Sequence, residues 1–380
     1  MNDTLRVSIL LNAAGIPYKI FEKLYSEKKL NQIYEGESFW NDVGISFPKQ
    51  KILSNLLYRK NFIDEEIKKL DSNNVKFINA FDKDYPSRLK DLKNPPIGLY
   101  IKGNADLNLF SVSIVGTRKC SLYGENVAQS IAKSLSESGI TVISGGAKGI
   151  DTAAHRGSLS SDGVTIAVFG NGLDVTYPSE NRDLFNRISE KGALISEYPF
   201  GTHGSVWTYP ERNRIVSGMS EITIVVESPI DGGAMITANE AKNLKRKISV
   251  VPGRINDEVC AGTNKLLKTA EPLVNIEEFI NEICSSFGQL DFGIENSENE
   301  SSNQISTPKI KKQKINIKKF PELSDNEQKI YELLKNHDNQ IIDTIISKSG
   351  LDLFSVQDAL MILESLGLIT TKAGRYSISK

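Results

Sequence analysis

The sequence predicts an α/β protein: a parallel sheet covered by helices on both faces, with a small helical domain before it and a second small domain after it. From about residue 98 to about residue 285, short apolar runs typical of strands alternate with helix-length segments. The regions on either side have helical periodicity instead. A chain of 380 residues is long enough for two or three domains with their own cores.

Composition narrows the class of protein. Hydrophobic residues make up 39% of the chain and charged residues 24%, as in ordinary soluble globular proteins. The net charge of −1 gives no overall basic field, so any nucleic-acid site must be local. The three cysteines, Cys120, Cys260 and Cys284, form no CxxC pair, so we expect neither a disulfide framework nor a zinc site. We expect a cytoplasmic protein without a signal peptide or a membrane span.

The first domain is expected over residues 1–75. Apolar residues recur there at helical spacing, with a break at Gly15-Ile16-Pro17. This pattern predicts a small helical domain, similar to SAM or helix-hairpin-helix modules. Two roles stay open for it: a DNA-associated module or, as we favour, a docking domain without a ligand of its own.

The middle domain is expected over residues 76–287. A connector at its start contains Pro95 and Pro96, which cannot continue a helix. Helices fit between most of the strands that follow, as in a parallel sheet with both faces covered. Apolar runs predict those strands at 98–102, 111–115, 140–144, 164–169, 193–196, 222–226 and 248–251.

The C-terminal part divides into a linker and a compact domain. Residues 288–319 are polar and then lysine-rich, which indicates a flexible linker. Within residues 320–380, Ser324 and Glu327 have the spacing of a capping box at the start of a helix. Two more helices and a hairpin around Ala373-Gly374 complete the layout of a winged helix.

Three glycine-bearing loops follow predicted strands: Gly116-Thr117-Arg118, a loop with Gly145, Gly146 and Lys148, and Gly170-Asn171-Gly172. The carboxyl ends of parallel strands share one edge of the sheet, so these loops are expected to meet there. Glycine lets the backbone approach a ligand, and the first N–H groups of a helix bind anions. The loops therefore predict a phosphate-lined crevice, although glycines that only form tight turns are an open alternative.

The common nucleotide cofactors fit this pattern poorly. The first loop is not GxGxxG, and the second strand ends in serine and glycine rather than in an acid that could bind ribose. No segment matches GxxxxGK[ST], so no apparatus for ATP hydrolysis is visible. We expect no cofactor.

Cations and aromatic residues occur where a nucleic acid could use them. The guanidinium of Arg118 can bind phosphate through two hydrogen bonds, and Lys148 adds a second positive charge. Trp207 and Tyr209 stand beside Arg212 and Arg214. Aromatic faces next to cations suit single-stranded nucleic acid, but a salt-bridged surface with packed aromatic residues has the same composition.

Taken together, the motifs resemble the bacterial DNA-processing protein A family (DprA, or Smf). The resemblance covers about residues 80–275. It implies an extended Rossmann-like domain, flanked by a helical domain and often by a C-terminal winged helix. It also implies a homodimer that binds single-stranded DNA and loads the RecA recombinase onto it during natural transformation and homologous recombination, without catalysis. The segments that carry it are "SIVGTRKCSLYG", "VISGGAKGIDTAAHRGSL", "VFGNGLDVTYPSENRDL", "LISEYPFGT", "YPERNRIVSGMS", "GAMITANEAKNLKRKISVVPG" and "GTNKLL".

The family's DNA-contacting role is carried onto the residues that match its motifs. Tyr209 is the expected base-stacking residue, with Trp207 as the second choice. No catalytic or metal-binding residue is implied. The DNA-contacting set is Gly116, Thr117, Arg118, Gly145, Gly146, Lys148, Gly170, Gly172, Trp207, Tyr209, Arg212, Asn213 and Arg214.

An enzyme of similar fold is the main alternative. The segment "DGGAMITANE" is similar to the PGGxGTxxE motif of LOG-type nucleotide phosphoribohydrolases, with Glu240 in the place of the catalytic acid. The proline and the third glycine are missing, and the threonine stands one position late, which moves the glutamate off the line of attack. A sensor that only binds a small nucleotide is a third possibility. Asp151 and His155, four residues apart, could form an acid–base or metal pair, but the simpler expectation is that Asp151 caps the helix and that His155 makes a structural hydrogen bond.

The charge of the C-terminal domain argues against binding of duplex DNA. Residues 320–380 hold six cations and nine anions, a net charge of −3. The candidate recognition helix, 353–366, contains Asp358 and Glu364 and no cation. Duplex binding depends on neutralising several phosphates, so we expect a protein-contact or dimer-modulating module.

Overall fold

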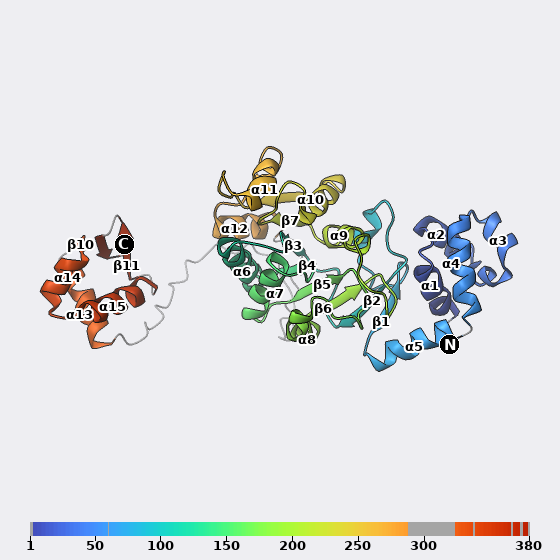
Figure 1. The fold of residues 1–380 in the computed structure, drawn as a ribbon, viewed down its shortest axis with the longest axis horizontal. Helices are drawn as coiled ribbons and strands as arrows, with labels where there is room; N and C mark the ends of the chain where they lie inside the picture. Colours follow the sequence, from blue (N-terminus) through green and yellow to red (C-terminus); the bar gives the residue numbers. More distant parts are fainter. Residues whose placement is uncertain are drawn as a thin grey trace, which may run out of the picture. The chain divides into compact units, whose positions relative to one another are not determined.

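The computed structural model describes residues 3–59, 61–287, 324–336, 339–365, 368–372 and 375–378. The chain divides into two compact units, Met1–Ser297 and Glu298–Lys380 (Figure 1). The predicted linker, 288–319, lies outside the described residues. No helix in the described part of the chain is both long and apolar enough to cross a membrane.

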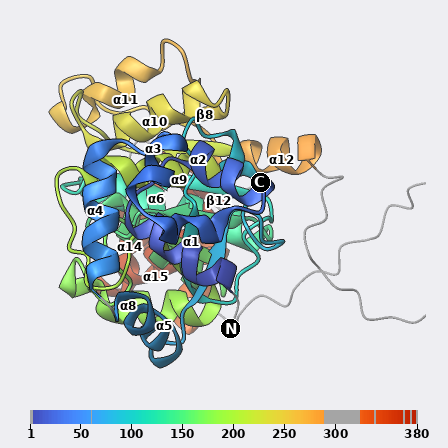
Figure 2. The same ribbon diagram turned by 90° about the vertical axis from the view of Figure 1, so that its right-hand side faces the viewer.

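The first unit begins with a group of short helices, which face the viewer in Figure 2. Buried side chains of the first helix, among them Leu10 and Leu11, share one apolar cluster with Leu99 and Ile101 of the sheet. The helical group is therefore packed onto the sheet rather than tethered to it. Its elements are α1 (Asp3–Ala13), α2 (Tyr18–Ser26), η1 (Leu30–Glu35), α3 (Glu37–Asp42), α4 (Phe47–Tyr58) and α5 (Phe62–Ser72).

A nine-stranded sheet in the order β1-β2-β6-β5-β4-β3-β7-β8-β9 forms the middle of this unit. All neighbouring strands are parallel except β1–β2 and β2–β6. The mostly parallel sheet is the one that the sequence predicts, with an antiparallel edge in addition. The strands are β1 (Lys76–Asn79), β2 (Gly98–Gly103), β3 (Ser111–Val115), β4 (Thr141–Ser144), β5 (Thr165–Phe169), β6 (Ala193–Ser196), β7 (Ile222–Val225), β8 (Lys247–Val250) and β9 (Glu271–Pro272).

Helices cover both faces of the sheet. Val112 and Ile114 of β3 pack with the helices of one face, whereas Val115 packs with those of the other, as the alternation of side chains along a strand requires. One face carries α6 (Leu122–Glu137), α7 (Ile150–Ser160), α8 (Arg182–Lys191) and α12 (Ile276–Phe287). The other carries α1, α2, η1, α3 and α4 together with α9 (Thr208–Met219) and α10 (Gly233–Asn243), whereas α5 packs in a separate cluster with Phe77 and Tyr100. Shorter helices complete the unit: η2 (Ser87–Asp91), η3 (Ser179–Asn181), η4 (Glu258–Cys260) and α11 (Ala261–Leu266).

The strand order changes direction at β3. From β3 the chain continues through β4 and β5 toward one edge of the sheet, and it returns to β7 on the other side of β3. In open α/β sheets the loops that leave two such neighbouring strands diverge, and a crevice opens beyond their carboxyl ends. The fold therefore places a ligand site beside the loops that follow β3 and β7.

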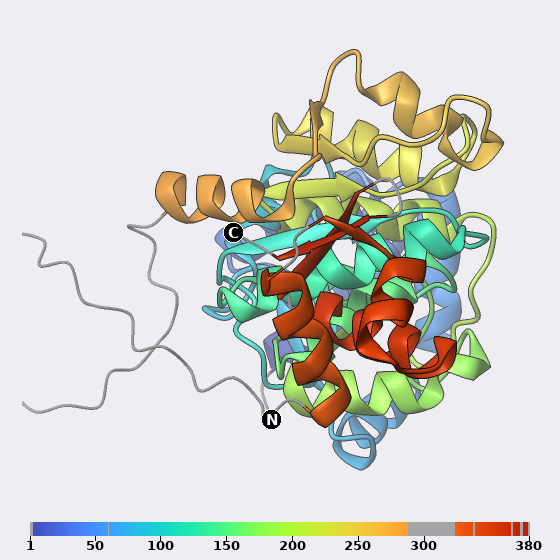
Figure 3. The same ribbon diagram turned by 90° about the vertical axis from the view of Figure 1, so that its left-hand side faces the viewer.

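In its described residues, the second unit contains three helices and a three-stranded antiparallel sheet in the order β10-β12-β11 (Figure 3, red). The predicted capping box is confirmed: the Ser324 N–H donates to a Glu327 carboxylate oxygen at 3.0 Å, and the Glu327 N–H points back to Ser324 Oγ at 3.5 Å. The hairpin turn Ala373-Gly374 lies outside the described residues. The elements are α13 (Asp325–Asn336), β10 (Gln340–Ile341), α14 (Ile342–Ser349), α15 (Leu353–Ser365), β11 (Ile369–Lys372) and β12 (Arg375–Ile378).

Candidate functional site

A cleft of about 840 Å³ opens at the switch point of the sheet. Its volume falls within the range of small-molecule and cofactor sites. The loops after β3 and β4, the segment that enters α9, α9 itself and the start of α10 form its walls. The residues from these segments include Gly116, Thr117, Arg118, Lys119, Gly145, Ala147, Asp151, His203, Ser205, Tyr209, Arg212, Asn213, Gly233 and Thr237.

Two of the glycine loops are packed against each other. A Cβ atom on Gly116 would stand 2.4 Å from Cγ1 of Ile150, and one on Gly149 would stand 2.4 Å from the Thr117 carbonyl oxygen. Gly149 also has a φ of +77°, a conformation that favours glycine. The Thr117 N–H donates to the Glu227 carbonyl at 2.7 Å. The close approach of the two loops fixes the backbone from which Arg118 projects.

Arg118 lies over an aromatic face. Its guanidinium carbon is 5.1 Å from the centre of the Tyr209 ring, within cation–π range. The centre of the Tyr177 ring lies 5.9 Å from the centre of the Tyr209 ring. Arg118 is exposed and forms no ion pair with any residue that the structure describes. Its donors are therefore held at the mouth of the cleft and remain open to an anion.

A buried arginine forms the floor of the cleft. Arg212 is only 4% exposed and donates from Nη1 to the Val168 carbonyl. A Cβ atom on Gly145 would stand 2.1 Å from that same Nη1, so the glycine makes room for the guanidinium. Burial lowers the pKa of Arg212, and the charge of Asp151 opposes that shift. The Nε atom of Arg212 has no partner among the described residues, which leaves a buried cation with a spare donor beneath the cleft.

Asp151 and His155 have structural partners. Asp151 accepts a hydrogen bond from the Ala147 N–H at 3.2 Å, whereas Gly149 is the N-cap residue of α7. The expectation that Asp151 caps this helix is therefore wrong. Thr165 Oγ1 donates to the Val142 carbonyl and lies 2.8 Å from Nδ1 of His155, which makes that nitrogen the donor to Thr165. Burial lowers the pKa of His155 to about 3, so its ring is neutral. The described residues include no cluster of three or more side chains suited to a metal ion.

The structure does not bring every residue of the predicted set into the cleft. Arg214 lies outside the lining and forms a two-pronged ion pair with Glu197, at 2.7 and 2.6 Å. Lys148 points outward and pairs with Glu180. Trp207 is 80% exposed at the residue before α9 and does not line the cleft.

The glycines of the set also divide. Gly116 and Gly145 line the cleft, and Gly170 lines a small adjoining cavity together with Arg118 and Tyr209. Gly146 and Gly172 line neither cavity. All three glycine loops nevertheless meet at one edge of the sheet, as their positions after strands predict.

Some cleft residues have no counterpart in the predicted set. Tyr177 lines both cavities and lies beside Tyr209. Its only signal in the sequence is its position shortly after the third glycine loop.

Asn213 is in the predicted set and lines the cleft. Its side-chain amide donates to the Gly233 carbonyl at 3.3 Å, which ties α9 to the first turn of α10. Thr237 reaches the cleft one turn later along α10.

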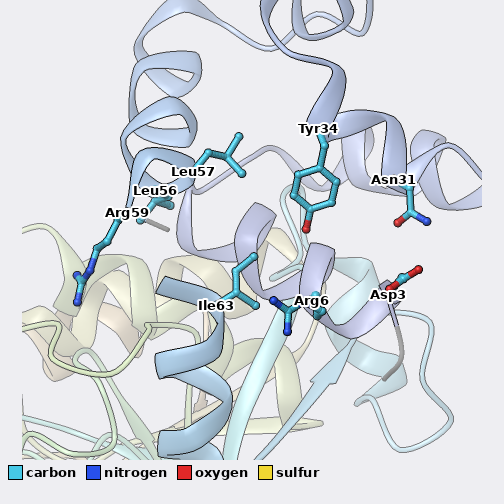
Figure 4. A pocket seen from close by; sticks show the side chains of 8 residues that line it. All are labelled: Asp3, Arg6, Asn31, Tyr34, Leu56, Leu57, Arg59 and Ile63. Atoms are coloured by element: carbon cyan, nitrogen blue, oxygen red, sulfur yellow. The ribbon is translucent and has the colours of Figure 1, made fainter. Parts of the chain in front are cut away.

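A second cavity, of about 500 Å³, lies among the N-terminal helices. Figure 4 shows Arg6 of α1 and Tyr34 of η1 directed into it. Its two arginines are already paired with α5: Arg6 with Asp64 at 2.8 Å, and Arg59 with Glu65 at 2.6 Å. This cavity therefore offers less unpaired positive charge than the cleft, whose Arg118 has no ion-pair partner among the described residues.

Comparison with known proteins agrees with this geometry. Residues 76–284, more than half of the chain, match the family model described as DNA recombination-mediator protein A. The putative DNA processing protein DprA of Mycobacterium tuberculosis (strain ATCC 25618 / H37Rv) is 34% identical over 295 residues, covering 77% of this chain and 71% of the relative. Protein Smf of Escherichia coli (strain K12) is 31% identical over 336 residues, covering 87% of this chain and 82% of the relative.

Two solved structures are also similar. DNA processing protein A from Streptococcus pneumoniae has a TM-score of 0.63 and 29% identity, covering 73% of this chain and 95% of that one. The Helicobacter pylori protein of the same name, whose structure describes a single-stranded DNA binding mode, has a TM-score of 0.52 and 29% identity, covering 56% of this chain and 96% of that one. The motifs, the fold and the relatives all lead to one conclusion: this chain belongs to the DNA recombination-mediator protein A family, whose curated relatives bear the names DprA and Smf.

Proposed function

We propose that this protein binds single-stranded DNA in the cleft and acts in DNA processing as a recombination mediator. The observation that carries the proposal is the exposed guanidinium of Arg118, supported on the ring of Tyr209 at the switch point of the sheet. A cation with open donors beside an aromatic face suits a strand whose phosphates need neutralising and whose bases need a stacking surface. The single-stranded DNA binding described for the Helicobacter pylori relative supports the same ligand.

The residues of the cleft have different roles in this proposal. Arg118 and the N–H groups of the loops with Gly116 and Gly145 bind phosphate. Tyr209 is the stacking surface, and the exposed Trp207 offers a second one beside the cleft. Arg212 acts from the floor as a fixed buried charge.

Two cations of the predicted set need other assignments. Lys148 reaches DNA only by leaving Glu180, so its contribution is small. Arg214 is held by Glu197 and stabilises α9 rather than contacting the strand.

The family supports the next step of the proposal: the bound strand is delivered to a RecA recombinase by a homodimer, as in natural transformation. The alternative is a protein that binds or hydrolyses a small nucleotide. Its candidate acid, Glu240, lies on α10 outside the lining of the cleft, whereas Thr237 of the same motif lies within it. This placement favours binding of a strand over hydrolysis of a nucleotide.

For the second unit we propose a winged helix that contacts protein rather than duplex DNA. Three helices followed by the β11–β12 hairpin, with β10 as a third strand, support this topology. The net charge of −3 over residues 320–380 supports a protein partner, because duplex DNA attracts domains with an excess of cations. Tight binding of duplex DNA by residues 320–380 at physiological salt would contradict the assignment.

Fluorescence anisotropy with a labelled oligo-dT of a few tens of nucleotides tests the proposed site. Arg118→Ala is compared with Arg156→Ala, which removes an exposed arginine on α7 whose nearest carboxylate, on Glu125, is 3.9 Å away. We expect Arg118→Ala to weaken binding about tenfold or more and Arg156→Ala to change it less than about twofold. Equal effects of the two variants would show that the cleft is not the binding site.

A further inference from the structure

We propose that the N-terminal helical domain positions one wall of the cleft through Asn12 and Glu66, although neither residue lines the cleft. The wall is residues 197–206, here called the entry segment, which leads from β6 to Trp207, the N-cap residue of α9. Its last residues, from His203 to Val206, line the cleft directly. The inference rests on the proposed function, since it makes the affinity for DNA depend on a domain distant from the strand.

Asn12 is the first contact between the helical domain and the entry segment. Its side chain lies at the end of α1 and is buried. The amide nitrogen donates to the Glu197 carbonyl at 2.8 Å, and the amide oxygen accepts from the Gly98 N–H at 3.2 Å. One side chain thus ties the start of the entry segment to α1 and to β2. Its loss removes the hydrogen-bond partner of the buried Gly98 N–H and of the partly buried Glu197 carbonyl.

Glu66 is the second contact. It lies on α5, is 2% exposed, and accepts hydrogen bonds from the Phe200 N–H at 3.3 Å and from the Tyr100 hydroxyl at 3.1 Å. Burial raises the pKa of this carboxyl, and the two hydrogen bonds oppose the shift. Burial of a carboxyl group costs free energy unless the group accepts hydrogen bonds. The Glu66 carboxyl therefore holds the Phe200 N–H and the Tyr100 hydroxyl close to it.

Phe200 adds an apolar contact at the same point. Its ring packs edge-on against Tyr100, with ring centres 5.4 Å apart, and belongs to one cluster with Ile9 of α1 and Ile67 of α5. Lys69 of α5 covers the ring at 6.0 Å. The helical domain therefore holds Phe200 through its backbone N–H and through its side chain.

These contacts lead directly to the cleft. After Phe200, the Gly201 N–H donates to the Asp174 carboxylate at 2.8 and 3.0 Å, and the Thr202 carbonyl accepts from the Gly172 N–H at 2.9 Å. The next residue along the chain, His203, already lines the cleft. The Glu197 carboxylate holds α9 through Arg214. The position of Tyr209 near the start of α9 therefore depends on where the helical domain holds the entry segment.

Trp207 reports on this wall without any DNA. The chain has two tryptophans, and the other, Trp40, is 3% exposed in α3. A Trp40→Phe background leaves Trp207 as the single tryptophan, which is excited selectively over the tyrosines at the red edge of the absorption band. In that background we compare Glu66→Leu, which removes both hydrogen bonds, with Glu66→Gln, which keeps an acceptor oxygen. Glu65→Leu is the matched control, because Glu65 is the neighbouring residue on α5 and forms an ion pair with Arg59 at the surface.

Time-resolved anisotropy of Trp207 and affinity for oligo-dT are measured on the full chain. We expect Glu66→Leu to increase the fast component of Trp207 motion and to weaken DNA binding about tenfold. Glu66→Gln is expected to restore both values to near wild type, and Glu65→Leu to leave both unchanged. Wild-type Trp207 motion together with wild-type affinity in a folded Glu66→Leu protein would overturn the inference.

A second variant keeps the test decisive if Glu66→Leu does not fold. Asn12→Ala removes the hydrogen bonds of Asn12 to the Glu197 carbonyl and the Gly98 N–H. For this variant too, we expect faster motion of Trp207 and weaker binding of oligo-dT, and wild-type values of both would overturn the inference. If the wild-type protein does not bind oligo-dT, the proposed function fails. The positioning role is then still decided by the motion of Trp207, which is measured without DNA.

Discussion

The guanidinium carbon of Arg118 lies 5.1 Å from the centre of the Tyr209 ring, so a cation from the loop after β3 rests on an aromatic residue of α9. The two residues come from segments on either side of β4, β5 and β6 in the sequence. The sheet brings them together because β3 lies at the point where the strand order reverses. The pair joins the two properties that a single strand requires, a phosphate-binding cation and a stacking surface.

The first prediction concerns the ring of Tyr209. Tyr209→Phe keeps the aromatic face, and we expect its affinity for oligo-dT to stay within about twofold of wild type. Tyr209→Leu removes that face, and we expect about tenfold weaker binding, because stacking of one base contributes about 1–3 kcal/mol. Anisotropy titrations of the two variants check this. Equal losses in both would assign the effect to the hydroxyl instead of to stacking.

The second prediction concerns salt. Phosphate contacts release counterions, so the logarithm of the binding constant falls linearly with the logarithm of the salt concentration. Removal of one phosphate contact reduces that slope by about 0.7 for a single strand. We expect this reduction in Arg118→Ala and no change of slope in Arg156→Ala, measured by titrations between about 50 and 300 mM salt. An unchanged slope in Arg118→Ala would mean that its guanidinium does not contact phosphate.

Sequence and structure agree best where a strand forms a continuous buried run. β3 and β6 lie at the predicted residues because all their side chains are buried, which gives an unbroken apolar signal. The sequence does not predict β1 or β9, because β1 has only two apolar residues, Phe77 and Ile78, and β9 spans only two residues, one of them proline. Sequence pattern also does not give the antiparallel direction of β2, because strand direction is decided by the connections and the neighbouring strands.

Some residues of the site can be predicted from the sequence and others cannot. The glycine loops and Arg118 were predictable, because their positions after strands place them at one edge. Arg212 and Arg214 are two residues apart, which on a helix turns them by about 200°. Arg212 therefore lies at the floor of the cleft, whereas Arg214 points away and pairs with Glu197. Composition alone does not distinguish these two arginines. The contacts of Asn12 and Glu66 with the entry segment join residues distant in sequence, for which a single sequence contains no signal.

The third prediction concerns Gly145. A methyl group at this position would stand 2.1 Å from Nη1 of Arg212, a guanidinium that burial leaves little room to move. We expect Gly145→Ala to lower the free energy of unfolding by about 1–3 kcal/mol, measured by urea denaturation. Gly233→Ala is the control, because a Cβ atom there meets nothing within 4 Å. No difference between the two alanine variants would contradict the packing described for Arg212.

The fourth prediction concerns acid stability. Burial lowers the pKa of His155 to about 3, whereas an unfolded histidine titrates near 6.5. The neutral ring therefore contributes stability that is fully present above pH 6.5 and is lost as the pH falls toward 3, by about 1.4 kcal/mol per pH unit. Burial raises the pKa of Asp151, which acts in the opposite direction, so only a comparison with a variant isolates the histidine.

His155→Asn supplies that comparison, because it keeps a donor toward Thr165 but does not titrate. We expect the unfolding free energy of the variant to fall less steeply than that of the wild type between about pH 6 and pH 4. Parallel curves for the two proteins, from urea denaturation at several pH values, would contradict a neutral buried His155.

The most direct test of the central claim is the dependence of affinity on ligand length. Wild-type protein and Arg118→Ala are titrated with labelled oligo-dT of increasing length, with duplex DNA and AMP as competitors. If the cleft binds a strand, the affinity rises with each added nucleotide, and neither duplex DNA nor AMP displaces the labelled oligo-dT. The affinity of Arg118→Ala is then much lower than that of the wild type. Affinity independent of length, with AMP displacing the label or being cleaved, would contradict strand binding and make Glu240 the next residue to mutate.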